Sequence, residues 1–387
     1  MKSLRLLFAL LAVFGLVAAA CGDDGEDTGT GDGTETTEPA DDPCVVDQDA
    51  LDAAIAAVEE GGTDDTDEGT DDGADLDGSG MRVGMVYDIG GKGDQSFNDA
   101  AFEGLTRAQE DFGFEVEDLE PSAGGENRGE LLQLLADEDY DLIIGVGFAF
   151  EEIIAEVAGN YPDITFAVVD AAPEADNIKG LVFAEEEGSF LVGAAAALTT
   201  ETDHVGFIGG VESPLIQKFE AGFVCGVHAV NPDIEIDSTY ITQPPDFAGF
   251  NDPARGGEIA SSMYEDGADI VYHAAGGSGG GLFETAYDNG DVWAIGVDSD
   301  QYLTVGEPQN ERILTSMLKE VDVAVYGAIE DFISGDTAGG ATVFDLSIDG
   351  VGYSTEGGFI EEHVPTLEGY KSLIIDGTIE VPDTPGS

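Results

Sequence analysis

Short apolar runs alternate with amphipathic segments along the first half of the chain after residue 80. The apolar runs, which predict buried strands, span 82–87, 142–146, 165–169 and 179–183. Segments with apolar residues at helical spacing lie between them, at 96–112, 128–135 and 150–158. Continuous apolar strands that alternate with helices predict a parallel sheet with helices on both faces.

The same alternation starts again in the second half of the chain. Strands are predicted at 205–208, 238–241, 270–273 and 292–296, with helices at 214–230, 254–266 and 281–288. Two successive α/β units of similar size predict a duplicated, two-lobed architecture. Ligands of such sheets bind beyond the carboxyl ends of the strands, so two lobes bring two such edges face to face.

The first twenty residues predict a secretory signal peptide. A short basic stretch precedes an uncharged apolar run, which ends in Ala18-Ala19-Ala20 directly before Cys21. An apolar run this short, followed by small residues, is typical of a cleaved signal rather than a spanning helix. Because the arrangement is similar to a bacterial lipobox, we expect Cys21 to be the lipidated N-terminus of the mature chain. The alternative is a plain secretory signal with an incidental cysteine.

Residues 21–80 predict an acidic tether. No Lys or Arg occurs from Gly22 to Gly80, where Gly, Asp, Glu and Thr dominate. Such a segment buries too little apolar surface to order itself, and its charges extend it. Within it, Leu51, Ile55 and Val58 have helical spacing, which predicts a short helix at 49–58.

The number of cysteines allows one disulfide in the mature chain. The chain has three cysteines, and lipidation of Cys21 leaves Cys44 and Cys225 as an even pair in an exported protein. We consider a disulfide between them and two unpaired thiols as alternatives.

Charge excludes several classes of partner. The chain has 82 Asp and Glu against 12 Lys and Arg, a formal net charge of −70. Such a surface repels phosphate backbones and anionic head groups, so we expect no nucleic-acid partner and membrane contact only through a lipid. A hydrated carboxylate shell also resists salt-induced aggregation, and we interpret the charge as adaptation to a saline habitat. Stability that falls steadily as NaCl rises would contradict this interpretation.

Candidate ligand-binding residues follow the predicted strands. Asp88, Phe97 and Asn98 follow the first strand in a glycine-rich loop, where Ser96 or Asp94 is positioned to cap the next helix. Phe97 is read either as a stacking platform or as a core residue. Asp170 directly follows the strand at 165–169 and is read either as a helix cap or as a ligand acceptor.

Three further features of the sequence have both a functional and an ordinary structural explanation. The run Glu185-Glu186-Glu187 is similar to a metal cluster, but in a chain this acidic it predicts a solvated turn. The glycine-rich loop at 275–281 is weak evidence for a ligand site, because glycine also marks ordinary turns. Lys319 is read as either a surface charge or a functional cation in a chain poor in basic residues.

Catalytic signatures are missing from the sequence. The four histidines have no zinc-ligand spacing, and neither a Gly-x-Ser-x-Gly elbow nor a phosphate-binding Gly-Lys-Ser/Thr loop occurs. We therefore expect a binding protein rather than an enzyme, with no cofactor and no metal.

Ordered motifs across residues 81–377 resemble one known family. They are Val86-Tyr87-Asp88-Ile89-Gly90-Gly91 with Ser96-Phe97-Asn98, Phe166-Ala167-Val168-Val169-Asp170, Phe250-Asn251-Asp252-Pro253, Ile295-Gly296-Val297-Asp298-Ser299-Asp300 and Leu314-Thr315-Ser316-Met317-Leu318-Lys319. Together they resemble the basic membrane protein family, the PnrA-like substrate-binding lipoproteins. The resemblance implies a type I periplasmic-binding-protein fold: two Rossmann-like lobes with three hinge crossings.

The resemblance also implies a ligand and a set of residue roles. The implied ligand is a purine nucleoside, delivered to the permease subunits of an ABC importer at the outer face of the cell membrane. By family motif, the resemblance implies that Phe97 and Phe250 stack on the base. It implies that Asp170 and Asn98 bond to the edge of the base, with Asp88 nearby. It also implies that Asp298 binds the ribose, with Lys319 and the backbone of Gly277 beside it. The segment before Phe250 is longer than in typical members, which keeps Phe247 as an alternative stacking residue. Val211-Glu212 also follows a Gly-Gly pair where members usually have Met.

We expect lobe 1 to comprise residues 81–186 and 315–340, and lobe 2 to comprise 187–314 and 341–384. The alternative functions are a receptor of the same fold for a sugar or another small molecule, a sensory receptor, and a nucleoside hydrolase.

Overall fold

The computed structural model describes residues 44–61 and 76–386. The expected signal peptide at 1–20, the expected lipidated Cys21, and the parts of the expected tether at 21–43 and 62–75 lie outside the described residues.

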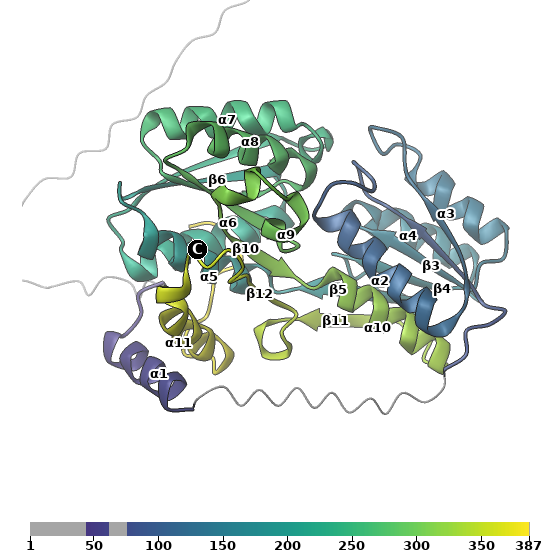
Figure 1. The fold of residues 1–387 in the computed structure, drawn as a ribbon. Coiled ribbons are helices and arrows are strands. Elements are labelled where there is room, and N and C mark those ends of the chain that lie inside the picture. The colour runs from purple at the N-terminus through teal and green to yellow at the C-terminus, as the bar shows by residue number, and fades with distance from the viewer. Residues whose placement is uncertain (1–43, 62–75, 387) are drawn as a thin grey trace, which may run out of the picture. The chain divides into compact units, whose positions relative to one another are not determined.

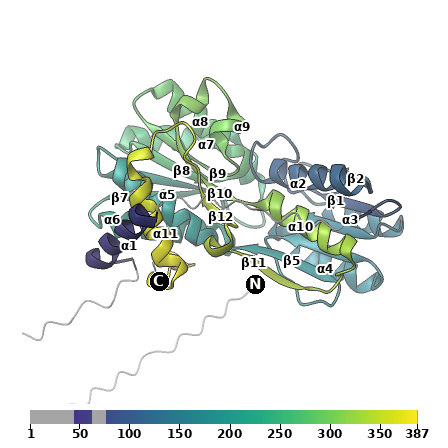
Figure 2. The ribbon, with the colours of Figure 1, turned by 60° about the horizontal axis from the view of Figure 1, so that its bottom comes forward.

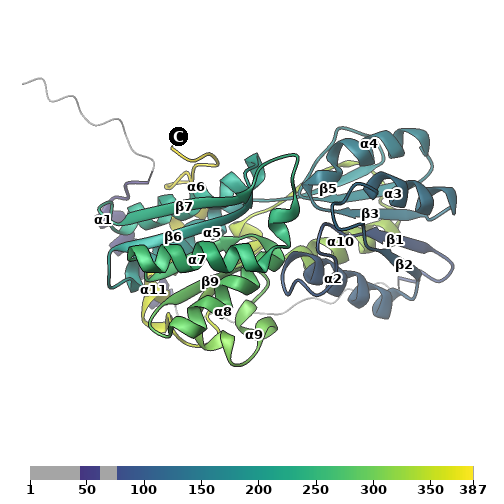
Figure 3. The same ribbon diagram turned by 90° about the horizontal axis from the view of Figure 1, so that it is seen from above.

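The first sheet is entirely parallel and has helices on both faces. Its order is β11-β5-β4-β3-β1-β2. The strands are β1 (Arg82–Val86), β2 (Glu115–Leu119), β3 (Leu142–Val146), β4 (Thr165–Val169), β5 (Ile178–Phe183) and β11 (Gly340–Phe344). On one face α2 (Phe97–Phe112) packs beside α10 (Val321–Ser334), and on the other lie α3 (Arg128–Asp137) and α4 (Glu151–Asn160), as Figure 3 shows.

The second sheet repeats this arrangement with one reversed strand. Its order is β12-β10-β9-β8-β6-β7, and only β12 pairs antiparallel. The strands are β6 (His204–Val211), β7 (Glu235–Thr242), β8 (Ile270–Ala274), β9 (Trp293–Asp298), β10 (Ile313–Lys319) and β12 (Val351–Tyr353). One face is covered by α5 (Glu185–Thr199) and α6 (Pro214–Val230), and the other by α7 (Pro253–Asp266) and α8 (Gly279–Asn289) (Figure 1).

Short elements complete the described part of the chain. They are η1 (Phe148–Phe150), η2 (Ala248–Phe250), η3 (Gly276–Ser278), α9 (Gln301–Val305), η4 (Gln309–Arg312), η5 (Leu346–Ile348), η6 (Glu361–His363) and α11 (Val364–Ile375). None of the described helices is both long and apolar enough to span a bilayer.

The chain passes between the two sheets three times, as the type I periplasmic-binding-protein fold requires. The passages follow β5, β10 and β11. Two of the expected lobe boundaries are corrected by these positions. Residues 315–319 belong to β10 in the second sheet, and residues 341–344 belong to β11 in the first. β10 continues to the buried Lys319, so the chain leaves the second sheet only after this residue.

An N-terminal helix is attached to the second lobe. The helix expected at 49–58 is α1 (Gln48–Gly61), which packs beside α11 (Figure 2). Its Leu51 is buried, and Ile55 contacts the backbone at Gly369, where a Cβ atom would come within 2.8 Å of the isoleucine side chain. Cys44, just before this helix, forms a disulfide with Cys225 of α6. The start of the described chain is thereby fixed to the second lobe.

Candidate functional site

A pocket lies where the carboxyl ends of strands from both sheets meet. The space between its walls, counted together with the open solvent at its mouth, is about 530 Å³. The loops after β1, β3 and β4 border it from the first lobe, and α6, η2 and the ends of β8 and β9 from the second. Its lining includes Asp88, Asp94, Phe97, Asn98, Phe148, Asp170, Phe250 and Asp298.

The loop after β1 fixes the start of α2 at the pocket wall. The Asp94 carboxylate accepts hydrogen bonds from the backbone N–H groups of Ser96, Asn98 and Asp99, over 2.9–3.1 Å. Asp94 therefore caps the helix, and burial raises its pKa to about 6. Ser96 occupies the N-cap position without a side-chain capping bond, so its hydroxyl is available for another partner.

The buried Asp88 has a hydrogen bond at its backbone and an ion pair at its side chain. Its backbone N–H donates to Asn98 Oδ1 over 2.9 Å, and its carboxylate pairs with Arg128 Nη2 at 2.6 Å. Burial raises the pKa of the Asp88 carboxyl, and the Arg128 guanidinium opposes that shift. Asp88 thus lines the pocket with one oxygen already bound to a buried arginine that the sequence analysis did not identify.

Two aspartates take equivalent places in the two lobes. Asp170 follows β4 and Asp298 ends β9, and both have left-handed backbone conformations, with φ of 66° and 64°. A left-handed non-glycine residue costs energy that the surrounding structure must supply, and such residues concentrate at functional sites. The repeated conformation aims one carboxylate from each lobe at the pocket.

Lys319 lies behind the pocket lining and pairs with Asp170 and Glu185. Its side chain is 1% exposed, and its Nζ lies 2.7 Å from Asp170 Oδ1 and 3.1 Å from Glu185 Oε1. Burial alone lowers the pKa of Lys319, but Asp170, Glu185 and Asp298 outweigh burial and raise it. Lys319 therefore stays cationic and links β10 of the second lobe to the first lobe.

The positive charge of Lys319 is smaller than the negative charge of the carboxylates near it. Burial raises the pKa of Asp170 to about 7; Lys319 opposes the shift, while Glu185 and Asp298 add to it. The buried carboxylates of Asp170, Glu185 and Asp298 share Lys319, and only Glu185 has a second lysine beside it. One of the three therefore takes up a proton more readily than an ordinary aspartate.

The expectation that Glu185–Glu187 form a solvated turn is wrong. These residues are the first turn of α5, and Glu185 is fully buried. Lys218 of α6 lies 3.1 Å from Glu185 and 3.6 Å from Glu186, so two lysines compensate the burial. Sequence composition could not show this, because both lysines reach Glu185 from distant parts of the chain.

Aromatic rings enter the pocket from both lobes. Phe97 of α2 and Phe250 of η2 line it, and the Lys319 Nζ lies 5.2 Å from the centroid of the Phe97 ring. Phe148 of η1 lies edge-on to Phe250 with ring centroids 6.3 Å apart, and 5.9 Å from the ring of Phe247. Phe247 itself is outside the pocket lining and lies over Arg128 instead, 5.5 Å from its guanidinium carbon.

The eight expected ligand-binding residues gather around this one pocket. Asp88, Phe97, Asn98, Asp170, Phe250 and Asp298 line it, whereas Lys319 lies behind Asp170. Gly277 is outside the lining, which includes its neighbour Gly276. Phe148 lines the pocket and Arg128 binds Asp88, and neither is among the residues expected from the sequence. For Phe148 a signal existed, because it follows a predicted strand directly after Gly147.

A buried histidine, His273, precedes the lining residue Ala274. His273 of β8 bonds to Gln301 Oε1 through Nε2 at 3.0 Å. Burial lowers the pKa of His273 to about 4, so its imidazole is neutral at physiological pH. His273 is not among the residues that line the pocket.

Comparison with known proteins gives one consistent family. A family model described as ABC transporter substrate-binding protein, PnrA-like, matches residues 81–385. The CD4+ T-cell-stimulating antigen of Listeria monocytogenes is 39% identical over 328 residues, 79% of this chain and 89% of the relative. The ABC transporter nucleoside-binding protein BmpA of Lactococcus lactis is 32% identical over 325 residues, 78% of this chain and 89% of the relative.

Solved structures agree with the sequence relatives. The structure of an ABC transporter system solute-binding protein from Aeropyrum pernix K1 has a TM-score of 0.68 and 29% sequence identity. The match covers 78% of this chain and 94% of the other.

Proposed function

Because the chain belongs to the family of PnrA-like ABC transporter substrate-binding proteins, we propose that it binds a purine nucleoside between its two lobes. It does so as a lipid-anchored receptor on the outer face of the cell membrane and passes the nucleoside to the permease subunits. Cys21, directly after the signal-like segment, is the proposed lipid attachment site.

One observation carries the choice of ligand. Phe97 and Phe250 come from opposite lobes, yet both line the same pocket, together with a carboxylate from each lobe. A flat heterocycle fits between two such rings, and each base–aromatic contact contributes about 1–3 kcal/mol. The curated relative from Lactococcus lactis, named a nucleoside-binding protein, supports the same ligand class.

The polar groups divide between the two parts of a nucleoside. In the proposed complex Asp170 and Asn98 bond to the edge of the base, with Asp88 near them. Asp298 accepts hydrogen bonds from the ribose hydroxyls, with Lys319 and the backbone near Gly277 beside it. Hydrogen bonds to charged groups contribute about 1.5–3 kcal/mol each, so Asp298 is the main determinant for the sugar.

The charge of the pocket favours a nucleoside over a nucleotide. The charged residues in the lining are Asp88, Asp94, Asp170 and Asp298. The two neighbouring cations, Arg128 and Lys319, are already paired with Asp88 and Asp170. A phosphate group would therefore meet net repulsion, whereas a neutral ligand with several N–H and O–H donors would not.

The proposal describes a receptor rather than an enzyme. The family is one of substrate-binding proteins, and the two lobes supply stacking surfaces and hydrogen-bond acceptors rather than a nucleophile activated by a base.

Calorimetric titration of the purified protein tests the proposal. We expect saturable binding of inosine, guanosine or adenosine, weak binding of cytidine and no response to ribose. Phe97→Ala removes most of the affinity, whereas Phe102→Ala, on the exposed side of the same helix, does not. Ribose binding without any purine nucleoside response would instead establish a sugar receptor, and release of free base from inosine would establish a hydrolase.

A further inference from the structure

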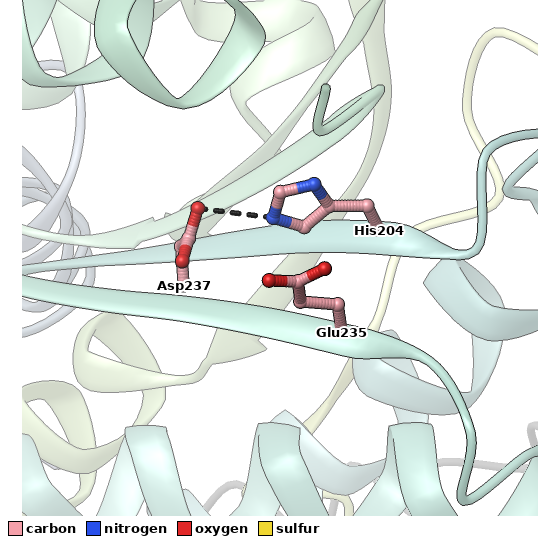
Figure 4. A group of neighbouring side chains, drawn as sticks. All are labelled: His204, Glu235 and Asp237. Carbon is pink, nitrogen blue, oxygen red and sulfur yellow. Dashed lines mark hydrogen bonds and ion pairs between the residues drawn. The ribbon is translucent and has the colours of Figure 1, made fainter. Parts of the chain in front are cut away.

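Three potential metal ligands converge at the edge of the second sheet, away from the pocket. His204 is the first residue of β6, and Glu235 and Asp237 lie on the neighbouring edge strand β7. In the parallel register His204 is opposite Glu235, and Gly206 is opposite Asp237. Because side chains two residues apart share one face of a sheet, all three point to the same side, as Figure 4 shows.

The donor atoms are close enough to share one ion. His204 Nε2 lies 3.0 Å from Asp237 Oδ2, and one donor atom from each residue lies within 4.8 Å of the others. Two ligands of a tetrahedral Zn²⁺ ion, each about 2.0–2.1 Å from the metal, are roughly 3.3 Å apart. The His204–Asp237 pair already has about this spacing, and Glu235 reaches it by rotating an exposed side chain.

An ordinary ion pair does not account for the third residue. A His–Asp pair needs only His204 and Asp237, yet the Glu235 carboxylate also faces them. Within the described ranges the Glu235 side chain has neither a hydrogen bond nor an ion pair. Two carboxylates this close repel each other unless a cation lies between them.

Among the described residues, no lysine or arginine pairs with Glu235 or Asp237. Asp237 borders a surface hollow that β7 and α7 form, and Arg255 lies in the same hollow. Its guanidinium Nη1 is 2.9 Å from Glu258 Oε2, so this arginine is paired elsewhere. Asp266, a further acidic residue, lines the hollow and adds to its negative charge.

We propose that His204, Glu235 and Asp237 bind a divalent transition-metal ion of the Zn²⁺ class, with water as the fourth ligand. One imidazole nitrogen with two carboxylate oxygens suits Zn²⁺, whereas Ca²⁺ and Mg²⁺ prefer oxygen ligands alone. The ion joins the amino-terminal end of edge strand β7 to β6. Since ligands of this fold bind at the carboxyl ends of the strands, the metal stabilises the second lobe without entering the nucleoside pocket.

The expectation of no metal rests on the histidine spacing and on the Glu185–Glu187 run, neither of which includes these three residues together. His204 is far from Glu235-x-Asp237 in the sequence, and only the parallel pairing of β6 with β7 brings them together. The sequence does contain one indication of a metal site, because Glu235-x-Asp237 places two carboxylates on the same face of one strand.

Calorimetric titration of the metal-free full-length protein with ZnCl₂, in an excess of CaCl₂ that occupies non-specific acidic sites, tests the proposal. We expect one Zn²⁺ site, whose affinity falls by about tenfold or more in His204→Asn and in Glu235→Gln. His363→Asn and Glu258→Gln, matched changes of a distant histidine and of a paired carboxylate by the same hollow, keep the wild-type affinity.

Two further readouts separate metal binding from misfolding. Zn²⁺ raises the midpoint of thermal unfolding of the wild type, because it binds the native state, and this rise is lost in His204→Asn. Inosine affinity stays the same in His204→Asn, which shows that the variant is folded. Failure to bind Zn²⁺ in the presence of Ca²⁺, or equal Zn²⁺ affinity in the wild type, His204→Asn and Glu235→Gln, would overturn the proposal.

Discussion

The Ser96 hydroxyl, at the start of α2 in the first lobe, donates a hydrogen bond to Asp298 Oδ2 at the end of β9 in the second, over 2.6 Å. Both residues are buried, and burial raises the pKa of the Asp298 carboxyl while Lys319 and the Ser96 bond oppose the shift. One oxygen of the proposed ribose acceptor therefore also joins the two lobes. Closure of the lobes and sugar recognition depend on the same carboxylate.

The first prediction concerns this bond between the lobes. Ser96→Ala removes a buried hydrogen bond to a charged group, which contributes about 1.5–3 kcal/mol. Because the bond exists only when the lobes meet, we expect calorimetry to show inosine affinity reduced by about tenfold or more. Ser96→Thr keeps the hydroxyl and serves as the control. Equal affinity in Ser96→Ala and the wild type would show that the bond does not contribute to closure.

The second prediction separates sugar recognition from base recognition. Asp298→Asn should lower inosine affinity by about ten- to a hundredfold, because a charged acceptor for the ribose hydroxyls becomes neutral. Hypoxanthine, the same base without ribose, should bind the variant and the wild type equally. Competition binding with both ligands measures the two effects. A parallel loss of hypoxanthine affinity would place Asp298 at the base.

The third prediction distinguishes the aromatic residues. Phe250→Ala should reduce inosine affinity by about 1–3 kcal/mol, the value of one base–aromatic contact. Phe247→Ala should have a smaller effect, because Phe247 contacts Phe148 and Arg128 outside the pocket lining. Fluorescence or calorimetric titrations of the two variants give the comparison. A larger loss in Phe247→Ala would establish Phe247 as the stacking residue.

The fourth prediction concerns pH. With the Asp170 pKa raised to about 7 by burial, part of the unliganded protein has a protonated Asp170 near neutral pH. The N1–H of inosine donates a stronger hydrogen bond to the ionised carboxylate than to the protonated carboxyl group, so the affinity should fall as pH decreases below 7, by at most about tenfold per pH unit. Asp170→Asn cannot ionise and should show weaker inosine binding with a flatter profile between pH 6 and 8. Identical profiles in the two proteins would remove Asp170 from the base edge.

The fifth prediction concerns the disulfide between Cys44 and Cys225. Loss of a native disulfide typically costs about 2–5 kcal/mol of unfolding free energy. The double variant Cys44→Ala/Cys225→Ala should therefore unfold at lower denaturant concentration. Its inosine affinity should remain unchanged, because neither cysteine lines the pocket. Unchanged denaturant stability would mean that fixing α1 to α6 does not stabilise the second lobe.

Much of the fold follows from local patterns. The strands at 142–146 and 165–169 are present with these bounds, because fully buried parallel strands read as continuous apolar runs. In contrast, β2 was not predicted. Its sequence Glu-Val-Glu-Asp-Leu forms a partly exposed edge strand, in which acidic residues lower the apparent strand preference.

The site was predictable where residues directly follow strands, and not where distant elements meet. Asp88, Asp170 and Asp298 could be expected at the pocket because strand ends of parallel sheets converge there. The buried ion pairs Arg128–Asp88 and Lys319–Glu185 join residues far apart in the chain, so neither spacing nor composition indicates them. The misread Glu185 run is the clearest case, since its burial depends on lysines from β10 and α6.

A crystal structure of the protein with inosine tests the central claim most directly. We predict that the hypoxanthine ring lies between Phe97 and Phe250, with Asp170 at its edge and the ribose hydroxyls bonded to Asp298. Crystals saturated with inosine in which the two rings enclose no base, or in which the nucleoside lies elsewhere on the protein, would contradict the account.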